Sequence, residues 1–269
     1  MIERLLTGVV ALVREDGPAV FWCASLVVGV AYAVRSARRS GLDPRPAYWA
    51  ATLAIVVGVC GSRLLGMVVY PTSGPLALSE IVGGGHSYYG GLLAGTLTAL
   101  VYLRVRGVPV WRYADAMAPA CALGYCVGRV GCFLNGCDYG VLARGIFAVR
   151  YPPDTEAFVA QLQRGLIAPS ETLSLPVLPI QLLHAALGLF LFLLLRRPAG
   201  APGHRLGLFA LGYGVGRFVL EFGRGDFSAV AGPLSLHQAI SIGLVIAAAI
   251  LLLRARGGVP ASAAAAEAV

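Results

Sequence analysis

Long apolar stretches constrain this sequence more than any other feature. Seven of them are long enough for a membrane-spanning helix of about 20 residues, and they cover residues 17–35, 47–69, 88–104, 112–130, 178–196, 207–222 and 235–254. Only 13% of the 269 residues are charged, whereas about 25% are charged in soluble globular domains. A bilayer admits only α-helices and closed barrels as spanning structures. We therefore expect an all-α integral membrane protein with seven transmembrane helices.

The positions of the arginines predict the orientation. The chain has 21 basic residues, all of them arginine, against 13 acidic residues. Twelve arginines lie in the first, third and fifth connections and after the last stretch, whereas six lie on the opposite side. Because cytoplasmic segments are enriched in arginine, we expect the N-terminus outside and the C-terminus in the cytoplasm of a bacterial inner membrane. No basic face with interleaved aromatic residues is present, which excludes nucleic acid as a partner.

The connections predict a single domain. We assign residues 1–256 to one transmembrane domain and residues 257–269, which lack periodicity, to a flexible tail. Ala31-Tyr32-Ala33 has the pattern of a signal-peptidase site, but the arginines that follow it favour an uncleaved first helix. The longest connection, 131–177, contains a Pro-Pro-Asp turn and a helix-like segment at 155–167. It predicts a small extracytoplasmic cap.

Two of the six cysteines differ from the others. Cys132 and Cys137 lie five residues apart at the outer end of the fourth stretch, where an oxidising compartment permits a disulfide. The sequence leaves open whether this bond forms. No histidine stands near the pair in the sequence, so a zinc site is disfavoured and we predict no bound metal. The remaining cysteines lie within apolar stretches and are expected to be small core residues: Cys23, Cys60, Cys121 and Cys126.

Ionisable residues inside the apolar stretches indicate a function. They are Arg63, Asp115, Arg129, His184, Arg217 and Glu221. A charged side chain at the centre of a bilayer costs about 2.5–3.5 kcal/mol, so such residues are expected to face the bundle interior or a wet cavity. Three arginines against two acids indicate a site for an anion such as a phospholipid phosphate. Alternatively, Arg217 and Glu221 neutralise each other, because they lie four residues apart on one helix face.

A glycine-rich run surrounds Arg129. It reads Gly-Arg-Val-Gly-Cys-Phe-Leu-Asn-Gly-Cys-Asp-Tyr-Gly from residue 128 to residue 140. Glycines let the backbone approach other groups closely, and Asn135-Gly136 is a turn signal that can aim N–H groups at an anion. The run therefore predicts a phosphate cradle at a helix end. Other glycines four residues apart, such as Gly91 and Gly95, fit the small-xxx-small pattern of helix packing.

These motifs resemble those of the bacterial prolipoprotein diacylglyceryl transferases. The run around Arg129 resembles the family's most specific motif, and the segment 213–226, which contains Arg217, resembles its second arginine motif. Weaker similarities extend along most of the chain, at Gly61-Ser62-Arg63-Leu64, at Pro179-Ile180-Gln181-Leu182 and from Ser235 through Gln238 to Ser241. Seven spans with an external N-terminus are also what the resemblance implies.

The sequence departs from the family pattern where protons are handled. Tyr89 stands where the family has a histidine proposed as the catalytic base, and His86 lies three residues earlier. Further departures are Cys23 for a usual tyrosine, Cys132 for asparagine, Cys137 for glutamate and His184 for glutamate. The resemblance implies a retained scaffold and anion site with an altered base.

The resemblance also implies an activity. A diacylglyceryl group would pass from phosphatidylglycerol to the lipobox cysteine in the signal-peptide region of an exported prolipoprotein. Arg129 and Arg217 would hold the leaving phosphate, and either His86 or Tyr89 would take the thiol proton. The expected substrate-binding residues are Arg63, Gly90, Gly91, Asn135, Gly136, Gly140, Gln181, Tyr213, Glu221 and Arg224. This chemistry needs no cofactor, and we expect a monomer surrounded by membrane lipids.

Other functions fit the same residues. A lipid or anion transporter would use buried arginines and glycine-rich helices without forming a covalent product. A related enzyme would transfer the lipid to a different acceptor. A haem protein ligated by His86, His184 or His237 is a third alternative, although His184 and His237 are expected to be hydrogen-bonded structural residues.

Overall fold

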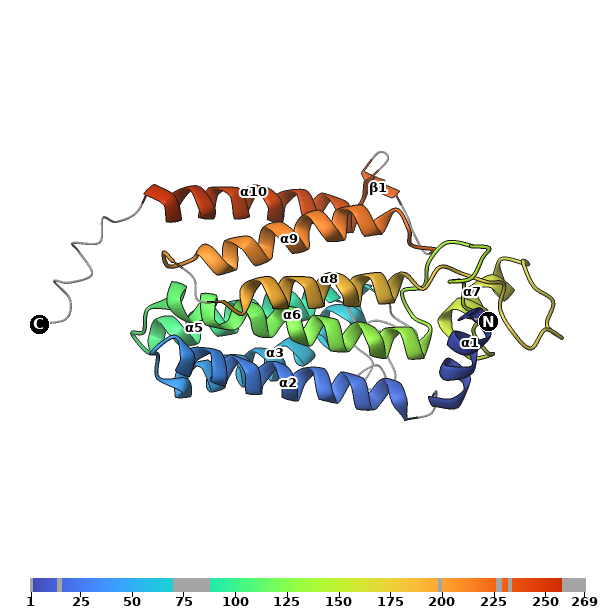
Figure 1. The fold of residues 1–269 in the computed structure, drawn as a ribbon, viewed down its shortest axis with the longest axis horizontal. Helices are drawn as coiled ribbons and strands as arrows, with labels where there is room; N and C mark the ends of the chain where they lie inside the picture. Colours follow the sequence, from blue (N-terminus) through green and yellow to red (C-terminus); the bar gives the residue numbers. More distant parts are fainter. Residues whose placement is uncertain are drawn as a thin grey trace, which may run out of the picture. The chain divides into compact units, whose positions relative to one another are not determined.

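Helices dominate the computed structural model, which describes residues 2–13, 16–69, 88–197, 200–225, 229–231 and 234–257 (Figure 1). The helices are α1 (Ile2–Val13), α2 (Gly17–Arg39), α3 (Pro44–Val69), α5 (Tyr88–Val105), α6 (Val110–Asn135), α7 (Glu156–Gln163), α8 (Ile180–Leu195), α9 (His204–Glu221) and α10 (Leu236–Gly257). A short antiparallel hairpin of β1 (Ala229–Ala231) and β2 (Leu234–Ser235) precedes α10. The described residues thus have the expected helical class.

Each of the seven apolar stretches contains a helix. Four helices, α2, α3, α6 and α10, are long and apolar enough to cross a membrane. The helices α5, from Gly90 onward, and α8 are apolar but shorter, and α9 carries Arg217 and Glu221. These helices are those of a membrane protein. The expected tail lies outside the described residues, except for Gly257 at the end of α10.

The fourth apolar stretch forms a longer helix than the sequence predicts. It was expected to end at residue 130, but α6 continues to Asn135. Gly131 lies inside this helix and packs against Trp22, whose Cδ1 atom lies 2.9 Å from the place that a Cβ would take. Gly136 ends it with a φ of +71°, which glycine adopts without the steric cost of a side chain.

A first helix, α1, is absent from the predicted elements. Its 12 residues are too few to cross a bilayer, so a search for long apolar runs passes over it. Val10 is fully buried in a cluster with Tyr151 and Val177. The Nε atom of Arg150 lies 3.1 Å from Glu3 Oε1. These contacts pack α1 against the long connection between α6 and α8.

That connection contains the expected short helix. The predicted segment 155–167 is observed as the shorter α7, whose N-cap is Thr155. The Oγ1 atom of Thr155 accepts a hydrogen bond from the Phe158 N–H at 3.4 Å, which satisfies one of the free amides at a helix start. Asp154 precedes the cap with a φ of +68°. The predicted Pro-Pro-Asp turn is therefore where the chain reverses into α7.

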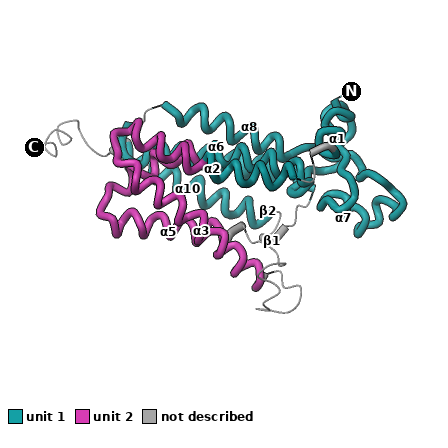
Figure 2. Tube along the Cα trace, turned by 90° about the horizontal axis from the view of Figure 1, so that it is seen from below, with its two compact units in different colours: residues 1–28, 121–269 teal, residues 29–120 magenta. Residues whose placement is uncertain are grey.

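The chain divides into two compact units (Figure 2). Residues 1–28 and 121–269 form unit 1, and residues 29–120 form unit 2. In unit 2, α3 and α5 pack closely because glycines face each other, and a Cβ on Gly91 would lie 3.2 Å from the Gly58 carbonyl oxygen. Elsewhere in this unit, Tyr113 is buried beside alanines and donates a hydrogen bond to the Asp43 carbonyl oxygen at 2.9 Å.

Candidate functional site

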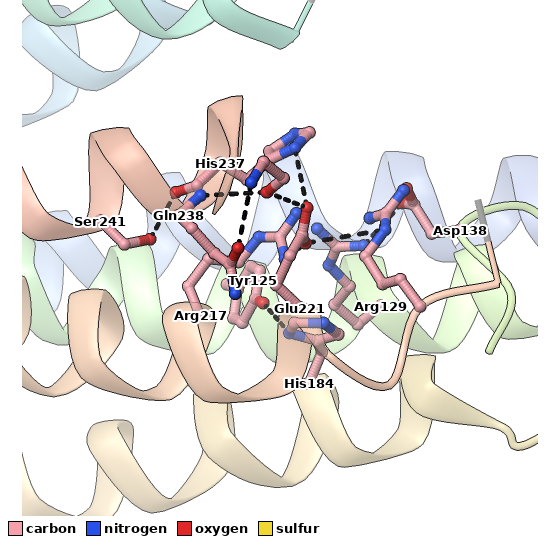
Figure 3. A network of polar contacts seen from close by, with 11 residues as sticks. Tyr125, Arg129, Asp138, His184, Arg217, Glu221, His237, Gln238 and Ser241 are labelled. Carbon is pink, nitrogen blue, oxygen red and sulfur yellow. Dashed lines mark hydrogen bonds and ion pairs between the residues drawn. The ribbon is translucent and has the colours of Figure 1, made fainter. Parts of the chain in front are cut away.

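A network of buried ion pairs lies in unit 1, where α6 and α9 end and α10 begins (Figure 3). Its charged side chains are Arg129, Asp138, Arg217, Glu221 and Arg224, and we call them the ion-pair cluster. Except for Asp138, which is 31% exposed, their side chains are at most 12% exposed. Charges are this well buried in proteins only when they are paired.

Asp138 joins two arginines from distant parts of the chain. Its Oδ2 atom lies 2.6 Å from Arg129 Nη1, and its Oδ1 atom lies 2.6 Å from Arg224 Nη2. Burial opposes ionisation of Asp138, but the guanidinium groups of Arg129 and Arg224 outweigh it and hold the pKa of this carboxyl at about 2. The carboxylate is therefore ionised at every physiological pH.

Glu221 is the second acidic group of the cluster. Its Oε2 atom accepts from Arg217 Nη1 and lies 3.8 Å from Arg224 Nε. Its Oε1 atom accepts a hydrogen bond from Ser235 Oγ at 2.7 Å and lies 3.2 Å from His237 Nδ1. The neutral pair of Arg217 and Glu221, which the sequence allows, is thus formed, and Glu221 also joins α9 to the start of α10.

The start of α10 is fixed by a capping box. Ser235 Oγ accepts from the Gln238 N–H at 3.2 Å, and Gln238 Oε1 accepts from the Ser235 N–H at 3.0 Å. This reciprocal arrangement satisfies two amides at the helix start. The Ser235-to-Gln238 motif therefore orients the hydroxyl that binds Glu221.

The ion-pair cluster carries an excess of positive charge. Three guanidinium groups face two carboxylates among its members, so one positive charge is not balanced within the cluster. An anion with several oxygen acceptors suits such a site, because guanidinium groups bind phosphate and carboxylate with paired hydrogen bonds. The arrangement can hold a phosphate group and stabilise negative charge that develops on it.

Aromatic rings support Arg129 from one side. Its Cζ atom lies 5.1 Å from the centre of the Tyr125 ring, and Tyr213 meets the same ring edge to face at 5.2 Å. The Tyr125 hydroxyl lies 2.7 Å from Nδ1 of the fully buried His184. His184 and His237 are therefore both in polar contact with neighbouring side chains, as expected from the sequence.

The glycines of the run position the backbone. The Gly140 N–H donates to the Leu178 carbonyl oxygen at 3.1 Å, and the Gly136 N–H donates to Phe133 at 3.3 Å. A Cβ on Gly140 would also lie 3.0 Å from the Gly223 carbonyl oxygen. These two N–H groups are occupied within the protein, so the turn does not present them to an anion. Their hydrogen bonds instead hold the backbone of the turn in the position that places Asp138 beside the arginines.

Gln181 also holds this turn. It is fully buried, and its Nε2 atom donates to the Cys137 carbonyl oxygen at 2.8 Å and to the Tyr151 hydroxyl at 3.3 Å. Because Cys137 precedes Asp138, Gln181 supports the carboxylate between the arginines.

The other predicted residues belong to unit 2 or lie outside the described residues. Gly90 and Gly91 pack α5 against α3 in unit 2, where the half-buried Arg63 is also found. Tyr89 stands in the first turn of α5, but its side chain, like the whole of His86, lies outside the described residues. The structure thus groups Arg129, Arg217, Glu221 and Arg224 around Asp138, with Tyr213, Asn135, Gly136, Gly140 and Gln181 in the same unit.

Sequence reasoning missed the roles of Tyr125 and Asp138. Both carry a local signal, because Tyr125 lies one helical turn before Arg129 and Asp138 lies within the glycine-rich run. A search restricted to the apolar stretches omits Asp138, which follows the end of α6.

An apolar groove lies on α9 and α10. It has a volume of about 250 Å³ and is lined by Val215, Phe218, Val219, Ile242, Val245 and Ile246, with Ser241 at its side. Phe218 follows Arg217 directly in the sequence. The groove can hold a hydrocarbon chain, and its lining residue Phe218 is the sequence neighbour of a member of the ion-pair cluster.

Comparison with known proteins assigns a family description to most of the chain. The family model described as prolipoprotein diacylglyceryl transferase matches residues 19–254. Relatives named phosphatidylglycerol–prolipoprotein diacylglyceryl transferase include that of Symbiobacterium thermophilum, 29% identical over 263 residues, which cover 93% of this chain and 94% of the relative. That of Bacillus licheniformis is 27% identical over 246 residues, 88% of each chain. That of Rhodopirellula baltica is 30% identical over 162 residues, which cover 57% of this chain and 33% of the longer relative.

Proposed function

Because the chain belongs to the prolipoprotein diacylglyceryl transferase family, we propose that it transfers a diacylglyceryl group from phosphatidylglycerol to the lipobox cysteine of a prolipoprotein. The chain is a transferase of the membrane. The names of its relatives support the donor and the acceptor. The observation that carries the proposal is the buried ion-pair cluster with its excess positive charge.

The chemistry explains why such a cluster is needed. The acceptor thiolate attacks the glycerol carbon, the bond between this carbon and the phosphate oxygen breaks, and glycerol phosphate leaves. Negative charge therefore develops on the phosphate in the transition state. We propose that Arg129 and Arg217, which pair with Asp138 and Glu221, supply fixed positive charge that stabilises this leaving group. The apolar groove on α9 and α10, which Phe218 helps to line, suits an acyl chain of the donor.

The direct test combines donor and acceptor. Purified protein is incubated with labelled phosphatidylglycerol and a peptide that contains a lipobox cysteine, and mass spectrometry detects the diacylglyceryl adduct. We expect the adduct on the cysteine and release of glycerol phosphate. Lipid binding or movement without an adduct would instead support the transporter, and an adduct on another compound would identify a different acceptor.

The base is expected to involve His86 and Tyr89. At neutral pH most of an imidazole with an ordinary pKa near 6.5 is unprotonated and can accept a proton, whereas a phenol with a pKa near 10 is almost fully protonated and cannot. We therefore expect His86→Ala to lower transfer at pH 7 by about 10²-fold. Tyr89→His is expected to restore or raise it, with a rate that increases with pH as the imidazole loses its proton. The pH dependence of adduct formation measures both effects.

His204→Ala is the matched control, because His204 is the first residue of α9 and lies far along the chain from His86. An unchanged pH profile in His86→Ala would make His86 a loop residue. No gain in Tyr89→His would then reject a base at either position.

The arginine distribution supports a membrane orientation. We propose seven spans, which correspond to α2, α3, α5, α6, α8, α9 and α10, with the N-terminus outside and the long connection that contains α7 forming a small extracytoplasmic cap. In this arrangement the chain is a multi-pass monomer of the bacterial inner membrane, formed by one transmembrane domain over residues 1–256.

Reporter fusions test this orientation. Fusions after Arg45, Arg112 and Arg205 are expected to report a cytoplasmic location, because arginine-rich connections are retained there. A fusion within residues 150–170 is expected to report an external one. A uniform reversal of these signals would place the ion-pair cluster at the cytoplasmic end of the spans.

A further inference from the structure

Two cysteines lie next to the ion-pair cluster. Cys132 is in the last turn of α6, and Cys137 follows the turn at Gly136. The sulfur atoms of both cysteines and a carboxylate oxygen of Asp138 all lie within 4.8 Å of one another. The Cys137 Sγ donates to the Cys132 carbonyl oxygen at 3.7 Å. Both residues are half-buried.

These three side chains form a poor metal site. Asp138 already binds Arg129 and Arg224 through its two oxygens. Two thiols alone fall short of the three or four protein ligands that zinc takes. The nearby guanidinium groups also repel a cation. The cluster therefore suits reaction between its sulfur atoms better than metal binding.

The backbone favours such a reaction. Gly136, with a φ of +71°, reverses the chain after α6 and brings Cys137 back toward the helix end. Gln181 holds Cys137 through its carbonyl oxygen at 2.8 Å, so this hydrogen bond does not engage the thiol. A disulfide requires sulfur atoms about 2.05 Å apart, and side-chain rotation can bring two sulfur atoms together from within 4.8 Å.

We propose that Cys132 and Cys137 are a redox pair that an organic disulfide converts into an intramolecular disulfide beside the ion-pair cluster. One thiolate attacks the organic disulfide and releases one thiol. The second cysteine then attacks the mixed disulfide and releases the other thiol. The protein loses two hydrogen atoms, and the organic disulfide gains them as two thiols. The new bond ties the end of α6 to the residue that precedes Asp138.

Thiol counting tests this pair without any transfer assay, so the result is independent of the proposed function. The full chain in detergent is treated with an excess of oxidised glutathione, unfolded, and labelled with a maleimide. Four of the six cysteines are expected to be labelled. The peptide that contains residues 132–137 is expected to be lighter by about two hydrogen masses, and reduction should restore six labels.

Matched variants locate the bond. Cys126→Ser removes a cysteine of the same helix, and its remaining cysteines are still expected to lose two labels on oxidation. Cys132→Ser and Cys137→Ser are expected to lose no pair of labels. Persistence of all six labels in the unaltered chain would overturn the proposal. A stable glutathione adduct on Cys132 or Cys137 of the unaltered chain would also overturn it. Loss of two labels in Cys132→Ser would do the same.

Discussion

Arg129→Lys is expected to insert and fold normally but to lower diacylglyceryl transfer by about 10²-fold, the usual effect of removing one donor to developing negative charge. Arg129 pairs with Asp138 at 2.6 Å, and lysine keeps the positive charge of this pair. It lacks the planar group that lies over the Tyr125 ring and directs several N–H groups at once. The variant therefore separates the effect of the positive charge on transfer from the effect of the planar guanidinium group.

Adduct formation with labelled phosphatidylglycerol measures the effect. Arg144→Lys provides the matched control, because Arg144 is exposed in the connection after α6 and is expected to have no influence on the rate. Equal folding is checked by the thermal unfolding midpoint in detergent. Unimpaired turnover in Arg129→Lys would show that Arg129 does not bind the leaving phosphate.

Glu221→Gln is expected to destabilise the protein by about 3–5 kcal/mol, because removal of one partner leaves a buried charge uncompensated. Glu221 is 2% exposed and contacts Arg217, Ser235 and His237. In a chain of this size each kcal/mol shifts the unfolding midpoint by about 2–4 °C. The midpoint should fall by roughly 10 °C, and transfer should fall with it because Arg217 loses the group that orients it.

Ser241→Ala is the control for this substitution. Ser241 is also buried near the start of α10, and its hydroxyl donates to the uncharged His237 carbonyl oxygen at 2.7 Å. It is expected to cost no more than about 1 kcal/mol, the net value of one hydrogen bond. If Glu221→Gln unfolded at the same temperature as Ser241→Ala, Glu221 would not be the group that compensates Arg217.

Much of this architecture follows from the sequence by local rules. Helix positions follow because only apolar runs of sufficient length suit a bilayer, and every predicted run contains a helix. The grouping of Arg129 with Arg217 follows because a charge in an apolar segment needs a polar interior. The pairing of Arg217 with Glu221 follows from their spacing on one helix face.

The remaining features depend on contacts between distant residues. The close packing at Gly131 in α6 involves Trp22, which lies more than one hundred residues earlier in the chain. The position of α1 depends on Arg150 and on the buried cluster around Tyr151. Asp138 reaches both Arg129 and Arg224 only because the segments around Gly140 and Gly223 lie together. These contacts join residues that are far apart in the sequence, so no short sequence motif predicts them.

The double pairing of Asp138 has a consequence for turnover. Its two oxygens bind Arg129 and Arg224 as two oxygens of a phosphate would, so the carboxylate acts as an internal substitute for the substrate anion. In the proposed reaction an incoming phosphate competes with this carboxylate, so we expect Asp138 to weaken binding of the donor. The departing glycerol phosphate would meet the same competitor, which favours product release. We therefore expect Asp138 to lower the affinity for substrate and product together and to limit inhibition by the product.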